Sequence, residues 1–202
     1  MPTSLPPSLL LASASPRRRE LLWQLGVPHE ARAADIDEQR LPGEGMEACV
    51  QRLAHQKAQR VYQQQAPGRR LPVLAADTIV VLGERLLGKP SDRAQGLAML
   101  QMLSGRQHRV LTAVALQTQA GVSSHLSESQ VSFRSLSGEE CAQYWDTGEP
   151  CDKAGAYAIQ GYAAAFIRDL QGSYSGVMGL PLHETADLLR RAGVAVWQRA
   201  AS

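Results

Sequence analysis

A buried strand gives way to a helix within the stretch Leu9-Leu10-Leu11-Ala12-Ser13-Ala14-Ser15-Pro16-Arg17-Arg18. Its first four residues form an apolar run that is typical of a strand inside a core. Ser15 suits the N-cap of a helix and Pro16 its first turn, so a helix is predicted from here to Gly26. A strand followed directly by a helix is the building unit of an α/β protein.

The predicted start of this helix suits a phosphate group. Unpaired backbone N–H groups and the positive end of the helix dipole meet at a helix N-terminus. The hydroxyls of Ser13 and Ser15 and the guanidinium groups of Arg17 and Arg18 stand at the same place. Arginine adds forked, charge-assisted hydrogen bonds to phosphate oxygens. An ordinary capped surface helix with a solvated basic turn explains the same residues, so the stretch alone leaves both interpretations open.

Composition limits the classes of function. The chain has 202 residues, 44% of them hydrophobic and 20% charged, with a net charge of +2, as expected for one soluble globular domain over residues 1–202. Few aromatic residues and the lack of a long basic block argue against a nucleic-acid partner. The sequence shows neither a signal-peptide pattern nor an apolar run long enough for a membrane span. Three cysteines without CxxC spacing indicate reduced thiols and a cytoplasmic protein.

Strand and helix patterns alternate along the rest of the chain. Helices are predicted at about 46–65, 92–103, 137–148 and 180–191, and strands at about 72–82, 110–117, 129–136, 164–170 and 194–197. Asp92 and Ser137 are predicted N-caps, and Glu140 completes a capping box with Ser137. The alternation predicts an α/β protein, and the closely spaced strands around 110–136 indicate a mixed rather than a purely parallel sheet.

Asp77 is the most informative single residue, because it lies in the middle of an apolar strand. Four apolar residues precede it, and Ile79-Val80-Val81-Leu82 continue the run after Thr78. A buried carboxylate is costly unless it is paired or holds a metal. Such a group is suited to hold Mg²⁺ or to deprotonate a water molecule. The ordinary alternative is an exposed turn, which the continuing apolar run disfavours.

Asp35, Asp37 and Glu38 form a second acidic cluster in a polar, turn-rich segment. A solvated loop explains most of such a cluster. Mg²⁺ nevertheless needs only one or two protein carboxylates besides substrate phosphates, and Glu38 with Asp77 would supply them.

Three lysines complete the candidate cations. Lys57 falls on the apolar stripe of the helix predicted at 46–65, so it either extends to water or meets an anion. Lys89 and Lys153 lie in glycine-bearing loops, where a lysine is commonly solvated. With Arg17 and Arg18, these side chains would be able to surround a triphosphate if the fold brought them together.

Several familiar enzyme motifs are missing from the sequence. It has no GxxxxGK[ST] motif of a P-loop, no GxGxxG motif of a dinucleotide-binding fold and no GxSxG motif of a serine hydrolase. The five histidines do not have metal-ligand spacing.

Six motifs, in order along nearly the whole chain, resemble the Maf family of nucleoside triphosphate pyrophosphatases. They are Ser13-Ala14-Ser15-Pro16-Arg17-Arg18, Ala76-Asp77-Thr78, Gly88-Lys89-Pro90, Leu103-Ser104-Gly105, Asp152-Lys153-Ala154-Gly155 and Gly179-Leu180-Pro181-Leu182. The segment Asp152–Gly161 is similar to the branch that acts on dTTP and UTP, and the 7-methyl-GTP branch differs there.

The resemblance implies a house-cleaning enzyme that uses Mg²⁺ or Mn²⁺ and hydrolyses a nucleoside triphosphate to the monophosphate and pyrophosphate. It implies a mixed, twisted sheet flanked by helices, with a nucleotide cleft between two lobes in a Maf/ITPase-like fold, and a homodimer. Two alternatives stay open at this point. One is a nucleotide-binding regulator of septum formation with little catalysis, and the other is an enzyme of the same fold with a modified or non-pyrimidine substrate.

The resemblance also implies roles for individual residues. Asp77 matches the family's proton acceptor, and Asp77 with Glu38 matches a metal site. Positions tied to base choice match Arg17, Thr78 and Gln160. Positions that handle phosphates match Ser13, Arg18, Lys57, Lys89 and Lys153. Whether Asp77 is base or metal ligand, and which of dTTP, UTP, CTP or a modified pyrimidine nucleotide is preferred, stays open at this stage.

Overall fold

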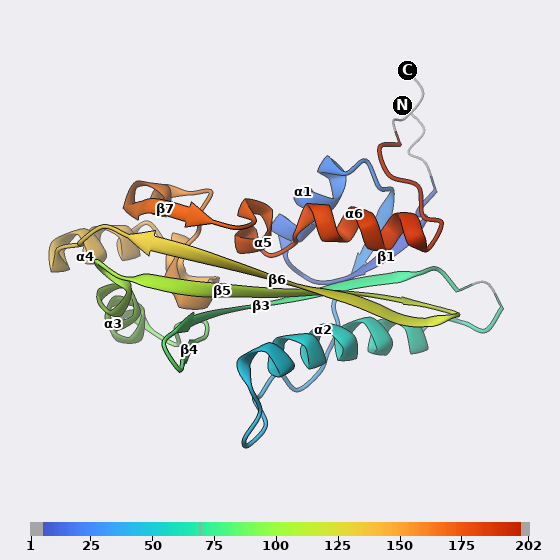
Figure 1. Cartoon of the computed structure of the whole chain (residues 1–202), viewed down its shortest axis with the longest axis horizontal. Coiled ribbons are helices and arrows are strands. Elements are labelled where there is room, and N and C mark those ends of the chain that lie inside the picture. The colour runs from blue at the N-terminus through green and yellow to red at the C-terminus, as the bar shows by residue number, and fades with distance from the viewer. Residues whose placement is uncertain (1–5, 69, 199–202) are drawn as a thin grey trace. The chain divides into compact units, whose positions relative to one another are not determined.

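The structure is a computed structural model that describes residues 6–68 and 70–198. Strands and helices alternate along the chain, as Figure 1 shows. The chain folds into two compact units. Unit 1 comprises the described residues up to Asp77, residues Thr112–Leu126 and the described residues from Gly179 onward, and unit 2 comprises Thr78–Leu111 and Ser127–Met178.

Unit 1 is built around a short parallel arrangement of strands. Its elements are β1 (Leu9–Ala12), α1 (Pro16–Gln24), β2 (His29–Arg32), α2 (Met46–Gln63), the first half of β3 (Val73–Leu82) and α6 (Leu182–Arg191). Strand β1 pairs in parallel with β2 on one side and with β3 on the other. All four residues of β1 are buried, which is expected for a parallel strand covered on both faces. Helix α2 packs against β1.

Unit 2 has an aromatic core. Its elements are the second half of β3, β4 (Arg85–Leu87), α3 (Arg93–Leu103), α4 (Gly138–Asp146), η1 (Glu149–Asp152), η2 (Ala154–Ala156), η3 (Tyr162–Phe166), β7 (Ile167–Gln171) and α5 (Tyr174–Met178). Phe133 packs edge-on against Tyr157 and Phe166, and Tyr144 packs edge-on against Phe166. Helices α3 and α4 lie against each other.

The strands form one mixed sheet in the order β2-β1-β3-β5-β6-β7, with β4 paired to β3. Strands β5 (Gln107–Thr118) and β6 (Gly121–Phe133) are consecutive neighbours, and β3, β5 and β6 each carry residues of both units. Strand β4 is antiparallel to β3 and β7 is antiparallel to β6, whereas β1 has parallel neighbours. The predicted α/β fold with a mixed sheet and flanking helices is confirmed.

Local capping signals are confirmed at two helices and differ at one. The Asp92 side chain accepts from the Gln95 backbone N–H, and Ser137 and Glu140 form the full capping box of α4. Ser15 occupies the N-cap position of α1 but makes no capping side-chain hydrogen bond. The Ser13 hydroxyl instead accepts from the Ser15 backbone N–H at 3.1 Å.

The predicted strand at 194–197 is wrong. Residues 194–196 have no regular structure and Trp197 lies in a bend. The backbone N–H groups of Trp197 and Gln198 donate to the carbonyl oxygens of Leu25 and Gly26. Trp197 has a φ of 60°, a left-handed conformation that a strand residue does not adopt. The predicted strand at 164–170 begins later, at Ile167, because residues 162–166 form the 3₁₀ turn η3.

No helix within residues 6–68 and 70–198 is both long enough and apolar enough to cross a membrane.

Candidate active site

Asp77 and Lys57 form a buried ion pair in unit 1. Asp77 lies on β3 and is 6% exposed, and Lys57 lies on α2 and is 7% exposed. The Lys57 Nζ is 2.6 Å from Asp77 Oδ1. The lysine that the helical spacing placed on an apolar stripe therefore meets an anion. This pairing explains how an apolar strand accommodates a carboxylate.

Glu38 brings a second carboxylate to the same ammonium. Its Oε1 is 2.7 Å from Lys57 Nζ, and its side chain is 55% exposed. Burial raises the pKa of the Asp77 carboxyl above its ordinary value, while the charges of Lys57 and Arg18 oppose the rise. The result is a buried carboxylate and a solvent-accessible one that share one cation.

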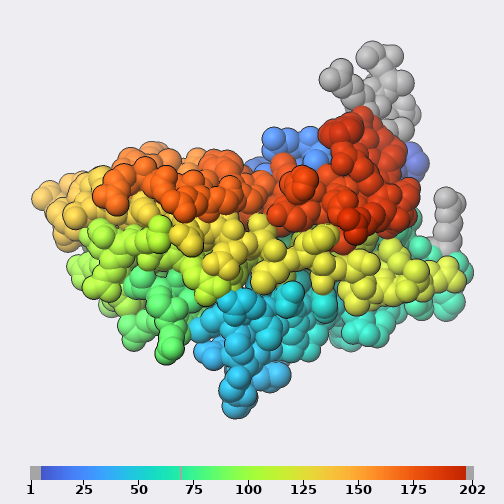
Figure 2. Space-filling model, viewed as in Figure 1, coloured from blue at the N-terminus to red at the C-terminus, as the bar shows by residue number. Residues whose placement is uncertain are grey.

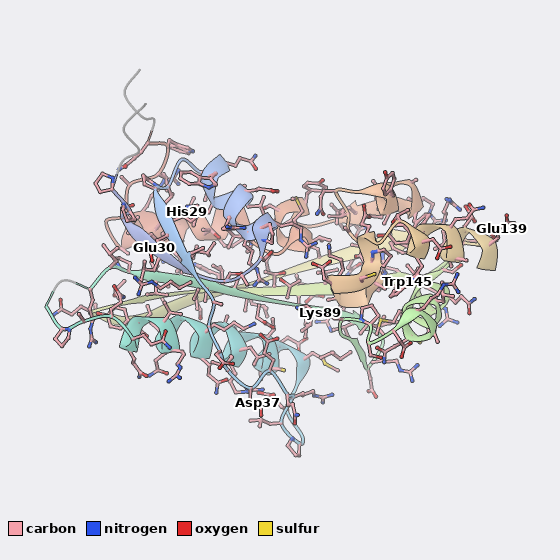
Figure 3. The ribbon with its side chains drawn as sticks, turned by 180° about the vertical axis from the view of Figure 1, so that it is seen from behind. His29, Glu30, Asp37, Lys89, Glu139 and Trp145 are labelled. Atoms are coloured by element: carbon pink, nitrogen blue, oxygen red, sulfur yellow. The ribbon has the colours of Figure 1, made fainter. Side chains whose placement is uncertain are left out.

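Glu38 belongs to the segment that connects β2 to α2. Around residues 37–43 this segment is exposed and projects from unit 1, as Figures 1 and 2 show. Asp35 and Asp37 are exposed on it, and Asp37 is labelled in Figure 3. The Asp37 carboxylate accepts from the Gln39 backbone N–H. Among the three acids of this segment, Glu38 is the one that contacts the buried pair.

Arg18 and Ser13 lie at the start of α1. The Arg18 Nε donates to the Gly179 carbonyl oxygen at 2.8 Å, and Nη1 is 3.5 Å from the Ser13 hydroxyl. Burial lowers the pKa of the Arg18 guanidinium, and the charges of Asp77 and Glu38 oppose that shift. Arg18 therefore lies within electrostatic reach of both carboxylates. Ser13, Arg18, Glu38, Lys57 and Asp77 form one connected group in unit 1.

Arg17 stands next to Arg18 on α1 and is half-buried. Its positive charge contributes to lowering the pKa of Arg18. Two guanidinium groups and a helix N-terminus therefore concentrate positive potential beside the carboxylates, as a polyphosphate requires.

The other predicted site residues belong to unit 2. Thr78 follows Asp77 in β3, so its side chain faces the opposite side of the strand, and it is half-buried. Lys89 is exposed after β4 and is labelled in Figure 3. Lys153 pairs with its neighbour Asp152. Gln160 is exposed, although the residues just before it are buried. The base-binding and phosphate-binding roles of these residues stay predictions.

The carboxylates of unit 1 fit a hard divalent cation. No cluster of three or more His, Cys, Asp or Glu side chains is found in the described part of the chain. Glu38 and Asp77 nevertheless converge on one positive group at 2.7 and 2.6 Å. Oxygen ligands suit Mg²⁺ and Mn²⁺, and Mg²⁺ takes one or two carboxylates together with phosphate oxygens and water. The donor set therefore fits a metal that is completed by substrate.

Gly179 was missed as a participant by sequence reasoning. Its carbonyl oxygen holds the Arg18 guanidinium, and its φ of 116° favours glycine. The sequence pointed to Gly179 only as the first residue of the motif Gly179-Leu180-Pro181-Leu182. The residue types of this motif suggest no chemistry by themselves.

The fold and this cluster define a member of the Maf family. The family model described as "Maf-like protein" matches residues 8–192, so the chain belongs to this family. It is 52% identical to a dTTP/UTP pyrophosphatase of Saccharophagus degradans over 194 residues, covering 96% of this chain and 92% of that protein. It is also 52% identical to the dTTP/UTP pyrophosphatase of Bordetella parapertussis, covering 95% of each chain, and to that of Bordetella avium, covering 94% of this chain and 98% of the relative.

Proposed function

We propose that this chain hydrolyses dTTP and UTP to the nucleoside monophosphate and pyrophosphate, and so removes these and modified pyrimidine nucleotides from the nucleotide pool. The observation that carries the proposal is the buried Asp77 carboxylate, which shares Lys57 with Glu38 beside the arginines of α1. Family membership and relatives named dTTP/UTP pyrophosphatase support the reaction and the substrate class.

In the proposed reaction a water molecule attacks the α-phosphorus. Its oxygen forms the new bond to phosphorus, its proton passes to the Asp77 carboxylate, and the bond from the α-phosphorus to the bridging oxygen breaks to release pyrophosphate. The raised pKa of Asp77 suits it to accept a proton, and Lys57 keeps it ionised beforehand. Glu38 and Asp77 are the carboxylates that would hold Mg²⁺ or Mn²⁺, whose charge would offset that of the phosphates.

The remaining predicted residues have binding roles in this proposal. Phosphate groups would be held by Ser13, Arg18, Lys57, Lys89 and Lys153. Base choice would involve Arg17, Thr78 and Gln160, because a glutamine amide offers both a donor and an acceptor to a pyrimidine edge. We also propose a single domain over residues 1–202, which the family match over residues 8–192 supports, and a homodimer, which the resemblance to the family implies. The free thiols of Cys49, Cys141 and Cys151 support a location in the cytoplasm.

Product analysis tests the proposed function. Purified protein is incubated with Mg²⁺ or Mn²⁺ and a panel of nucleoside triphosphates. We expect monophosphate and pyrophosphate, formed fastest from dTTP or UTP. Asp77→Asn should lose most turnover and some stability while it still folds, because Glu38 remains as a partner of Lys57, whereas Asp35→Asn, which changes an exposed acid of the β2–α2 segment, should retain its turnover. Tight nucleotide binding with no turnover would overturn the proposal in favour of a nucleotide-binding regulator of septum formation.

A further inference from the structure

Tyr144 and Glu149 hold the backbone on both sides of Gln160. Tyr144 lies on α4, which is seen in Figure 3 between the labelled Glu139 and Trp145, and it is 4% exposed. Its hydroxyl donates to Glu149 Oε1 at 2.7 Å and accepts from the Ala158 backbone N–H at 3.2 Å. Burial and the hydrogen bond to Glu149 raise the pKa of the phenol, so it stays protonated and remains a donor.

Glu149 accepts hydrogen bonds from backbone N–H groups on the other side of Gln160. Its Oε2 accepts from the Tyr162 backbone N–H at 3.0 Å, and its Oε1 accepts from that of Ala163 at 3.4 Å. A side chain at Gly161 would displace this carboxylate, because a Cβ there would lie 2.0 Å from Glu149 Oε2. The carboxylate therefore replaces a side chain at position 161 and caps the first turn of η3.

Ala158 and Tyr162, whose backbone N–H groups are held in this way, lie two residues before and two residues after Gln160. Ala158 and Ile159 are 5% and 6% exposed, whereas Gln160 is exposed. The Gln160 side chain leaves the core between these residues and Tyr162, and the backbone on either side of it is bonded to Tyr144 and Glu149. The Tyr144–Glu149 pair lies outside every residue assigned a role in binding or hydrolysis above.

We propose that Tyr144 and Glu149 are positioning residues that set the pyrimidine selectivity of this enzyme by fixing the backbone that carries Gln160. The inference rests on the proposed function, in which Gln160 reads the base. Uracil and cytosine present opposite donor and acceptor patterns at the same edge of the ring. A glutamine amide offers one acceptor and one donor, so the position in which its backbone holds it relative to the base decides which pattern it meets.

Two isosteric variants remove the clamp without removing bulk. Tyr144→Phe keeps the ring that packs on Phe166 and deletes only the hydroxyl. Glu149→Gln turns one of the two acceptor oxygens into an amide donor, which then faces either the Tyr162 N–H or the Tyr144 hydroxyl and the Ala163 N–H. In each variant we expect the kcat/KM ratio of UTP to CTP to fall about tenfold, because a hydrogen bond that distinguishes the two bases is weakened. The kcat for UTP should stay within about twofold of the wild-type value. The double variant should be no worse than the singles, because the two residues act as one unit.

Glu140→Gln is the matched control. Glu140 is a carboxylate on the same helix that accepts from the Ser137 backbone N–H and pairs with Arg134, whereas the N–H groups of Ala158, Tyr162 and Ala163 are bonded to Tyr144 and Glu149. This variant should lose stability while retaining the UTP to CTP ratio. Amide hydrogen exchange supplies a readout besides activity, since the N–H groups of Ala158, Tyr162 and Ala163 should exchange faster in Tyr144→Phe than in the wild type.

The outcomes separate this inference from the proposed function. An unchanged UTP to CTP ratio in both clamp variants, or an equal loss for the two nucleotides, overturns the positioning role. A wild type that hydrolyses UTP and CTP equally well also overturns it, but leaves the hydrolysis proposal intact. A wild type without turnover overturns the proposed function. The positioning role is then decided by the dissociation constant for CTP divided by that for UTP, which should fall in Glu149→Gln and stay unchanged in Glu140→Gln.

Discussion

The Lys57 Nζ lies 2.6 Å from Asp77 Oδ1, and both residues are buried. The pair connects α2 to β3 and places a lysine between two carboxylates, because Glu38 Oε1 is 2.7 Å from the same nitrogen. A buried charge without its partner is more costly than a missing pair. The stability of this unit and the protonation of Asp77 therefore both depend on Lys57.

Lys57→Met should strongly destabilise the protein. The variant keeps most of the aliphatic stem and leaves the Asp77 carboxylate buried without its cation, which typically costs about 3–5 kcal/mol. Urea denaturation measures the free energy of unfolding. The double variant Lys57→Met/Asp77→Asn should recover part of the loss, since it removes both charges. A double variant that loses the full sum of the two single effects would show that the ion pair is not the cause.

Glu38→Gln should raise the metal concentration that the enzyme needs and should change the stability of the fold little. Glu38 is largely exposed, so its substitution costs little stability, but it removes one of the two carboxylates that would hold the metal. We expect the Mg²⁺ concentration for half-maximal turnover to rise about tenfold, the lower end for disturbed metal sites. A Mg²⁺ titration at saturating UTP measures this. Asp35→Asn is the control, and an identical titration curve for Glu38→Gln and the control would remove Glu38 from the metal site.

His108 should make stability fall in mild acid. It is 2% exposed, contacts Phe133 edge-on and lies 2.8 Å from the Tyr157 hydroxyl. Burial lowers its pKa to about 4. An unfolded histidine has a pKa of about 6.5, so the unfolded chain takes up a proton between these values while the folded chain does not. This contribution to stability is present above about pH 6.5 and is lost as the pH falls towards 4.

The comparison of the wild type with His108→Gln isolates this effect. From about pH 7 to about pH 5 the wild type should lose about 2 kcal/mol more unfolding free energy than the variant. Burial also lowers the pKa of His29 and of His55. Both residues remain in the variant, so their contributions to the pH dependence cancel when the two proteins are compared. Urea denaturation at the two pH values measures the unfolding free energy of each protein. An equal loss of unfolding free energy in the two proteins would refute the role of His108.

Gly96→Ala should destabilise unit 2 although alanine favours a helix. A Cβ at Gly96 on α3 would lie 1.9 Å from Trp145 Cζ3 on α4. Overpacking typically costs about 1–3 kcal/mol, which exceeds the gain of about 1 kcal/mol in helix propensity. Gly138→Ala is the matched control, because its nearest neighbour would be the Gln101 amide nitrogen at 3.9 Å. Thermal unfolding of both variants measures the change in stability. A Gly96→Ala protein as stable as the control would contradict the close packing of the two helices.

Features encoded by neighbouring residues were predictable from the sequence. The Asp92 cap, the capping box of Ser137 and Glu140, and the apolar strand around Asp77 each depend on residues within a few positions of one another. The inward direction of Lys57 also followed from helical spacing. The Ser15 cap and the strand at 194–197 failed because local propensity was overridden by contacts of Ser13 and of Leu25 and Gly26 with those segments.

The partners of the site residues were not predictable, because they come from distant parts of the chain. Lys57 and Asp77 are 20 positions apart, and Arg18 and Gly179 are 161 positions apart. Glu149 looks like a solvated loop acid in the sequence, and its function as a backbone cap appears only when Tyr162 and Ala163 are placed beside it. Spacing indicated which residues carry chemistry, and the fold shows which of them meet.

Hydrolysis of UTP in ¹⁸O-labelled water tests the central claim most directly. The proposed attack on the α-phosphorus places the labelled oxygen in UMP and leaves pyrophosphate unlabelled, with both products lost in Asp77→Asn. Label in pyrophosphate with unlabelled UMP, or formation of UDP and labelled phosphate, would contradict the proposed attack on the α-phosphorus.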